Sequence, residues 1–367
     1  MKIKDLLKSI TEVADLSLQE SYDNSGLLIG NSETKIEKAL LTIDVTEAVI
    51  EEAINKNCSL IIAHHPLIFK GLKRIANNNP VERIVSAAIK NDIAIAAMHT
   101  NLDNIKNGVN GKLAAVLGLK NLNILSTASG NLRKIGVFCP TAQAGQVRQA
   151  MFEAGAGHIG DYDSCSFNTT GTGTFRGGDN TNPFVGQVGQ LHQEAEIKIE
   201  TIVPVFLVEK VIQAMKYAHP YEEVAYDIFS LDNAHNEIGA GMIGKLDQAL
   251  EEIDFLNLIQ EKLGTPFLRH TAFTGKKMQH IAICGGSGAF LLQQAKAAKA
   301  DAFVTADLKY HDFFEADGEL LVVDAGHFET EQFTKELMAE LIRKKIPNFA
   351  ALISEEHTNA VRYFRNL

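Results

Sequence analysis

The first third of the chain alternates short apolar runs with amphipathic stretches. Three uninterrupted apolar runs predict strands that are buried on both faces, because they leave no polar side. These runs lie at residues 39–43, 59–63 and 93–98. Three amphipathic stretches between and after them predict helices, two of which have start signals at Thr46 and Pro80. The stretches lie at residues 46–56, 80–90 and 108–119.

The last third repeats this pattern. Apolar runs predict strands at residues 280–284, 301–306 and 319–325. Helical spacing predicts helices at residues 288–300 and 330–345. Because strand and helix alternate in both segments, we expect the two segments to form one α/β domain whose sheet is covered on both faces.

The middle of the chain has a different order. Its elements read strand, helix, a polar Gly/Thr/Asn-rich stretch at 168–183, then strand, helix and strand, ending at residue 231. This order predicts a ferredoxin-like α+β unit of about 100 residues. Linker-like residues flank it at 126–131 and 232–237. We therefore predict an α/β domain at 1–130 and 237–367, interrupted by a smaller α+β domain at 131–236.

Composition and charge narrow the function classes. At about 150 residues per domain, a chain of 367 residues favours two domains. The net charge of −10 disfavours a nucleic-acid partner, because such binding depends on neutralising phosphates. No apolar run reaches the ~18 residues of a membrane span, and the N-terminus lacks signal-peptide features. We expect a cytoplasmic protein, with no membrane partner, whose four widely spaced cysteines are reduced and buried.

Histidines and carboxylates follow several predicted strands. His64 and His65 end the run at 59–63, just before Pro66, and the carboxyl ends of strands are where α/β proteins bind ligands. Taken alone, such a pair is more often one buried and one exposed histidine. Asp103 follows the run at 93–98, where an aspartate is commonly a turn or cap residue.

The last strand supplies a third set of side chains. His327 and Glu331 follow it at i, i+4 spacing, which places them on one helical face, although such pairs are often only surface pairs. Three histidines and two carboxylates at the strand ends of one predicted sheet favour zinc, iron or manganese. A single catalytic zinc takes three protein ligands, so five favour two metal ions with a bridging carboxylate.

Further candidates are weaker. Asp307, Lys309 and His311 follow the strand at 301–306, where they would bind substrate phosphate or act as acid and base, or form a salt-bridged turn. Gly285 to Gly288 lie between a strand and a helix, a geometry that can cradle an anion. In the middle segment, His219 and the acidic pair after it favour a structural strand start over a ligand site.

Six motifs together identify a resemblance that covers nearly the whole chain. They are SYDNSGLLIG (21–30), IIAHHPLIF (61–69), MHTNLDN (98–104), CGGSG (284–288), VTADLKYHDFFEA (304–316) and GHFETE (326–331). The chain resembles the NIF-three-like family, also called GTP cyclohydrolase type two homologues. The resemblance implies a three-layer α/β core with a dinuclear metal site. It also implies a PII-like identity for the inserted ferredoxin-like segment, and a toroidal homohexamer. Many relatives have Trp where this chain has Tyr22.

The resemblance also implies a ligand set and an activity. The implied ligands of two divalent ions are His64, His65, Asp103, His327 and Glu331. The implied activity is metal-dependent hydrolysis of a nucleotide such as GTP. Lys309 and the loop Gly285 to Gly288 would then face the triphosphate, and His311 would move protons. The alternative is a non-enzymatic metal-binding protein that regulates or delivers metal. Both hypotheses expect a small anionic or nucleotide ligand.

Overall fold

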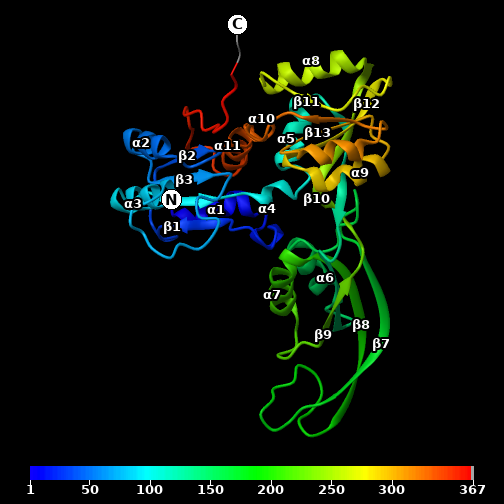
Figure 1. The fold of residues 1–367 in the computed structure, drawn as a ribbon. Coiled ribbons are helices and arrows are strands. Elements are labelled where there is room, and N and C mark those ends of the chain that lie inside the picture. The colour runs from blue at the N-terminus through cyan, green and yellow to red at the C-terminus, as the bar shows by residue number, and fades with distance from the viewer. Residues whose placement is uncertain (365–367) are drawn as a thin grey trace. The chain divides into compact units, whose positions relative to one another are not determined.

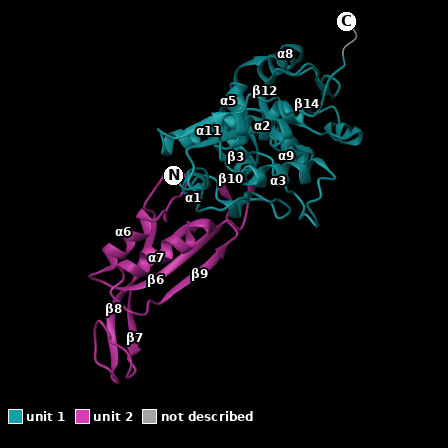
Figure 2. Cartoon of the chain, turned by 90° about the vertical axis from the view of Figure 1, so that its left-hand side faces the viewer, with its two compact units in different colours: residues 1–126, 237–367 teal, residues 127–236 magenta. Residues whose placement is uncertain are grey.

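The computed structural model describes residues 1–364, which form two compact units (Figure 2). Unit 1 comprises residues 1–126 and the chain from residue 237 onwards. Unit 2 comprises residues 127–236. Each unit has its own hydrophobic core.

The first sheet of unit 1 has five strands in the order β1-β4-β3-β2-β15 (Figure 1). Neighbouring strands are parallel except for β1, which is antiparallel to β4. Every residue of β3 and β4 is buried, as expected for a sheet covered on both faces. The strands are β1 (Gly26–Ile29), β2 (Lys38–Thr42), β3 (Leu60–Ala63), β4 (Ala94–Ala97) and β15 (Ala350–Ile353).

Helices with the predicted starts cover this sheet. The Thr46 side chain caps α2 (Glu47–Asn55) by accepting the Val49 N–H, and Pro80 is the first residue of α3 (Pro80–Lys90). Helices α2 and α3 share one core cluster with β2, β3 and β4. Helix α11 (Thr334–Lys345) packs on α1 (Ile3–Thr11) and contacts β2 and β15.

The second sheet of unit 1 has the order β11-β14-β13-β12-β10-β5. Strands β12, β13 and β14 are parallel, and β10 and β11 are antiparallel to their neighbours β12 and β14. Helices α5 (Val109–Val116) and α8 (Glu252–Leu263) cover one face, and α9 (Leu292–Ala297) covers the other. The strands are β5 (Lys120–Ala128), β10 (His235–Leu250), β11 (Arg269–His270), β12 (Met278–Ser287), β13 (Ala302–Ala306) and β14 (Leu321–Asp324).

The prediction of one sheet for these two segments is wrong. The strands that precede His64 and Asp103 belong to the five-stranded sheet, and the strand that precedes His327 belongs to the six-stranded sheet. Hydrophobic periodicity identifies a buried strand but carries no information about its pairing partners. Short helices after the strands carry the candidate ligands: α4 (Thr100–Asp103) follows β4, and α10 (His327–Glu331) follows β14.

Unit 2 contains one four-stranded antiparallel sheet in the order β7-β8-β6-β9. Its elements follow one another as strand, helix, strand, strand, helix, strand. Both helices pack into one core cluster with β6 and β8. The elements are β6 (Leu132–Pro140), α6 (Ala144–Glu153), β7 (Ser166–Arg176), β8 (Leu191–Pro204), α7 (Val208–Ala218) and β9 (Tyr226–Leu231).

Strand β7 occupies much of the polar Gly/Thr/Asn-rich stretch at 168–183, where the hydrophobic pattern predicts no strand. Its side chains are mostly exposed, so the stretch carries no hydrophobic signal. What holds it in the sheet is backbone pairing with β8 along its whole length, from Ser166 opposite Thr201 to Arg176 opposite Leu191.

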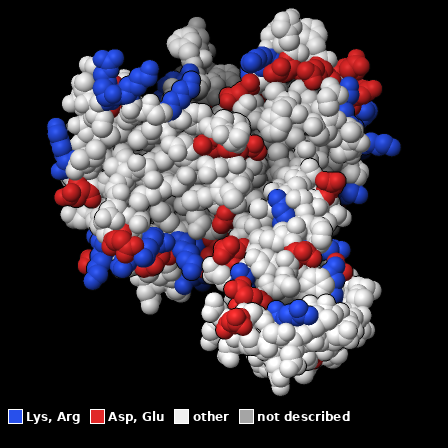
Figure 3. Space-filling model, turned by 90° about the horizontal axis from the view of Figure 1, so that it is seen from below, with Lys and Arg blue, Asp and Glu red and all other residues white. Residues whose placement is uncertain are grey.

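Surface charge and helix lengths bear on possible partners. On the face drawn in Figure 3, Lys and Arg side chains are interspersed with Asp and Glu, and neither sign covers the face continuously. Within residues 1–364, no helix has the length and apolar character needed to cross a membrane.

Candidate metal centre

Four histidines of unit 1 meet where strands of its two sheets end. His64 and His65 directly follow β3, His99 precedes α4, and His327 begins α10 after β14. Neighbouring rings in this cluster have centroids 4.8–5.5 Å apart. Asp103 and Glu331 are the last residues of α4 and α10, so they reach the same space. All five predicted ligands therefore come together, although they come from two sheets.

The Glu331 carboxylate lies at the centre of the cluster. Its Oε2 atom is 3.0 Å from Nε2 of His65, 3.0 Å from Nε2 of His327 and 3.6 Å from Nε2 of His64. Glu331 is almost completely buried, at 3% exposure. A single carboxylate therefore lies within reach of three imidazoles, and imidazole with carboxylate is a ligand set that transition metals bind.

Each of the four imidazoles makes a hydrogen bond through its Nδ1 atom, on the side of the ring opposite Nε2. With Nδ1–H donated to an oxygen, the lone pair on Nε2 faces the cluster, which is the orientation that metal-binding histidines need. The acceptors are Met98 O for His64 (2.9 Å), Asp44 for His65 (2.7 Å), Asp23 for His99 (2.8 Å) and Asp307 for His327 (2.7 Å).

Two buried polar atoms fit a metal ion. Nε2 of His64 and Oδ1 of Asp103 lie 3.7 Å apart, and within residues 1–364 neither has a hydrogen-bond partner. A buried polar atom without a partner costs about 1–3 kcal/mol, so such atoms are rare. A cation between them would satisfy both. Three overlapping groups of this cluster have the spacing of metal ligands. They are His64, His65 and His99; His65, His327 and Glu331; and His64, Asp103 and Glu331.

The pKa values follow from burying opposite charges together. Burial raises the pKa of Asp103 to about 7. The positive charge of His64 opposes this rise, and the negative charge of Glu331 adds to it. Burial alone would lower the pKa of His65, but hydrogen bonds to Asp44 and Glu331 raise it to about 10. For Glu331, the histidines outweigh burial and hold the pKa well below its ordinary value. Divalent ions would replace these protons as the balancing positive charge.

The glycines at the end of β12 pack against the cluster. Gly286 has φ +62°, and a Cβ there would stand 3.1 Å from Cδ of Glu331 and overlap its Oε1. The backbone N–H groups of Gly285 and Gly286 donate to Asn110 and Thr330, at 2.9 and 3.0 Å. These two donors are used inside the protein, so the prediction of a phosphate cradle is wrong for Gly285 and Gly286.

A cavity of about 410 Å³ opens beside the cluster. His99, Asp103, His327 and Glu331 form part of its wall, and the half-exposed ring of Phe290 is on its rim. The described residues that line it include no Lys or Arg.

The three predicted catalytic residues lie in different surroundings. Asp307 contacts the cluster, where it accepts from Nδ1 of His327. Lys309 and His311 are exposed on the turn that begins at Tyr310, and neither lines the cavity.

Sequence reasoning missed three residues of this centre. His99 belongs to a matched motif and follows a strand, the same signal that identified His64. Asp23 and Asp44 accept hydrogen bonds from Nδ1 of His99 and His65. The spacing of these aspartates in the sequence does not reveal that role. Thr100 donates to Asp23 and so supports the acceptor of His99, whereas Asn101 donates to Ala14 O, away from the cluster. The four cysteines are free, and Cys165 is only partly buried.

Comparisons with known proteins place this centre in context. The family model described as Duf34/NIF3 (NGG1p interacting factor 3) matches residues 1–360. A protein of Halalkalibacterium halodurans named GTP cyclohydrolase 1 type 2 homolog is 40% identical over 349 residues, which is 94% of each chain. A Bacillus subtilis protein of the same name is 38% identical over 92% of each chain. The crystal structure of a Bacillus cereus protein related to NIF3 matches with a TM-score of 0.87 and 38% identity over 99% of each chain.

Proposed function

The chain belongs to the Duf34/NIF3 family, and from that premise we propose that it is a dinuclear metal-binding protein that acts as a metal-dependent hydrolase. The observation that carries the proposal is the convergence of imidazole nitrogens and carboxylate oxygens on one space, including two buried atoms without a hydrogen-bond partner among the described residues. When bound, divalent ions such as zinc, iron or manganese lower the pKa of water toward about 7, which supplies a nucleophile for hydrolysis.

In the proposed centre, Glu331 would be a ligand shared by two ions. Glu331 belongs to two of the three ligand groups, one with His65 and His327 and the other with His64 and Asp103. Its Oε2 atom lies within 3.0–3.6 Å of the imidazoles of both groups, which supports a shared role. The Nδ1 contacts keep the rings in place, so little rearrangement is needed when the ions bind.

The proposed substrate is a nucleotide such as GTP. This choice rests on the name of the relatives, GTP cyclohydrolase 1 type 2 homolog. Asp307 has a positioning role in this proposal, because it orients His327. Lys309 and His311 stay predicted contacts for the anionic part of the substrate, since both side chains are exposed on the turn after Asp307.

A second candidate is a protein that binds or delivers metal without catalysis. It is favoured by the absence of Lys and Arg from the described wall of the cavity, which leaves no side-chain cation there for a triphosphate. In this reading the cavity is an exit path for the metal or a site for a small chelating ligand.

We further propose a PII-like, ferredoxin-like identity for unit 2. Support comes from its element order and its antiparallel order β7-β8-β6-β9, which are those of the split β-α-β arrangement. A toroidal homohexamer located in the cytoplasm is part of the same proposal. The mixed charge on the face in Figure 3 and the net charge of −10 agree with a protein that has no nucleic-acid partner.

The test combines metal analysis with turnover of GTP. Purified protein is assayed for bound metal and for formate release, beside Glu331→Ala and the control Glu319→Ala, which removes an exposed carboxylate. We expect about two ions per chain and formate release in wild type and control, and loss of both in Glu331→Ala. Two ions without formate release would refute the cyclohydrolase and support the delivery protein. Full metal content in Glu331→Ala would refute the ligand assignment.

A further inference from the structure

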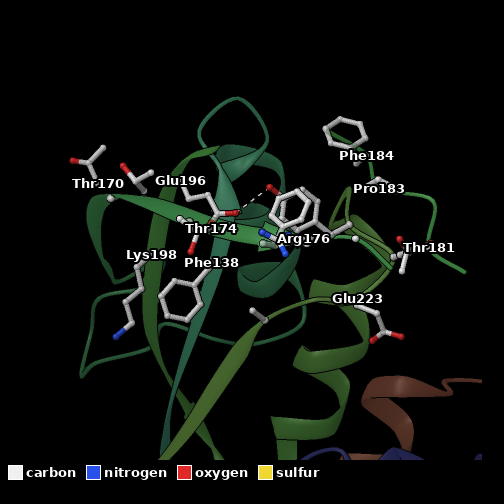
Figure 4. A pocket seen from close by; sticks show the side chains of 18 of the residues that line it. Phe138, Thr170, Thr174, Arg176, Thr181, Pro183, Phe184, Glu196, Lys198 and Glu223 are labelled. Atoms are coloured by element: carbon white, nitrogen blue, oxygen red, sulfur yellow. Dashed lines mark hydrogen bonds between the residues drawn. The ribbon is translucent and has the colours of Figure 1, made fainter. Parts of the chain in front are cut away.

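Unit 2 contains a cavity of about 770 Å³ that lies apart from its hydrophobic core (Figure 4). The helices of this unit pack on alternate residues of β6 and β8, such as Val137 and Ile199. The intervening residues Phe138, Glu196 and Lys198 line the cavity, because successive strand side chains point to opposite faces. The loop after β7 and the residues after α7 complete the wall. A cavity of this volume is in the range that holds small molecules.

Glu196 is a buried carboxylate in the wall of this cavity. It is 8% exposed, and its Oε1 accepts from the Tyr221 hydroxyl at 3.0 Å, drawn as a dashed line in Figure 4. No described residue donates to Oε2. Gly173, on the neighbouring strand, makes room for the carboxylate, since a Cβ there would overlap it. Oε2 is not one of the fully buried side-chain atoms that lack a partner, so it is open to the cavity that Glu196 lines. A cationic donor that enters the cavity could pair with this carboxylate oxygen.

The two cationic side chains in the wall, Lys198 and Arg176, form no salt bridge with Glu196 among the described residues. Lys198 pairs with Glu200 at 3.3 Å and lies over the Phe138 ring at 5.7 Å. Arg176 points toward the same space in Figure 4, yet no salt bridge joins it to Glu196 within residues 1–364. The lining contains four glutamates against these two cations, which leaves a net negative charge around the cavity.

Aromatic rings form the rest of the wall beside Glu196. Tyr221 stands between Phe175 and Phe184, with ring centroids 5.9 and 6.4 Å away. Aromatic faces attract cations, and they also bury the apolar body of a ligand. Phe184 is half-exposed on the loop after β7, so this ring is free to contact a molecule that enters.

We propose that the cavity of unit 2 binds a small organic cation, a protonated amine carried on an aromatic or apolar body. The ammonium group donates to Oε2 of Glu196, and the body packs between Phe175, Tyr221 and Phe184. The negative balance of the lining disfavours phosphates and carboxylates at the same place. This site is independent of the metal centre in unit 1.

The experiment titrates the metal-loaded full chain with 2-phenylethylamine and with its neutral counterpart 2-phenylethanol, by calorimetry at pH 7. Glu196→Gln keeps the shape of the side chain and removes its charge. Glu209→Gln makes the same change at an exposed glutamate of α7 that does not line the cavity, and is the matched control. Phe184→Ala removes one aromatic wall from an exposed loop and does not depend on how the buried substitution folds.

We expect 2-phenylethylamine to bind and 2-phenylethanol to bind at least about tenfold more weakly, since a charged hydrogen bond is lost. Glu196→Gln should weaken amine binding by a similar factor, Phe184→Ala should weaken it several-fold, and Glu209→Gln should change it little. An amine that binds Glu196→Gln as tightly as wild type occupies another site, and the proposal is then wrong. It is equally wrong if no amine binds, or if inorganic phosphate binds instead and Arg176→Gln abolishes that binding.

Discussion

Replacing Gly286 by alanine adds one methyl group beside the carboxylate at the centre of the cluster. The new Cβ would stand 3.1 Å from Cδ of Glu331 and 3.3 Å from Cε1 of His327, and it would overlap Oε1. The carboxylate cannot retreat easily, because it is buried and three imidazoles surround its other oxygen. Glu331 must therefore move away from the place where it reaches both ligand groups.

Two effects with different readouts contribute. An alanine at φ +62° has a left-handed backbone conformation, which costs about 1–2 kcal/mol of stability. Moving a ligand or its support typically weakens metal binding about 10- to 100-fold, or about 1.4–2.7 kcal/mol. The first effect lowers the free energy of unfolding even without metal. The second lowers metal affinity, and in the metal-free protein it adds to the loss of stability because Glu331 moves away from His65 and His327.

Gly264→Ala separates these effects. Gly264 has φ +65°, and a Cβ there would meet no atom within 4 Å, so this variant has the backbone cost without the clash. Metal affinity is measured by competition with a chelator, and stability of the metal-free proteins by urea unfolding. Both variants should lose stability, Gly286→Ala at least as much as Gly264→Ala, and only Gly286→Ala should lose metal affinity. The reasoning fails if Gly286→Ala binds metal as tightly as wild type, or if Gly264→Ala loses it too.

Three further predictions concern the histidines and the metal. Asp307→Ala removes the acceptor of Nδ1 in His327, so chelator competition should show metal affinity lower by about tenfold. Burial lowers the pKa of His219, which donates to Phe138 O and accepts from the Tyr221 N–H. The unfolded chain then binds that proton more readily, and stability is lost as pH falls below about 6.5. His219→Gln should flatten this slope in urea unfolding at pH 5 and 7.5, and an unchanged slope would contradict the assignment. Removing metal with a chelator should lower the melting temperature, because ions that bind the folded state stabilise it.

The residues of the centre were predictable to the extent that each one follows an apolar strand. His64, His65 and His327 have that signal, and the structure brings them together. Their sheet membership was not predictable, because it depends on which strands pair across more than 200 residues of chain. The His65 and Glu331 side chains, for example, meet at a separation of 266 residues.

Other parts of the fold and of the site could not be predicted from the sequence, for different reasons. Strand β7 is polar and mostly exposed, so only its pairing with β8 reveals it. The partners Asp23 and Asp44 act through one hydrogen bond each, which no periodicity records. The sequence position of Gly285 and Gly286 suits an anion site, but it does not show that their N–H groups are bonded to Asn110 and Thr330.

Strands β5 and β10 are neighbours in the six-stranded sheet, although unit 2 lies between them in the chain. Unit 2 is therefore an insertion in the connection between two adjacent strands. The chain enters and leaves it from neighbouring positions in the sheet. An insertion at this point leaves every strand of the six-stranded sheet in place and interrupts none of the hydrogen bonding between its strands. The two cores can therefore accumulate substitutions separately, and a relative that replaced the insertion with a short turn would keep the metal centre intact.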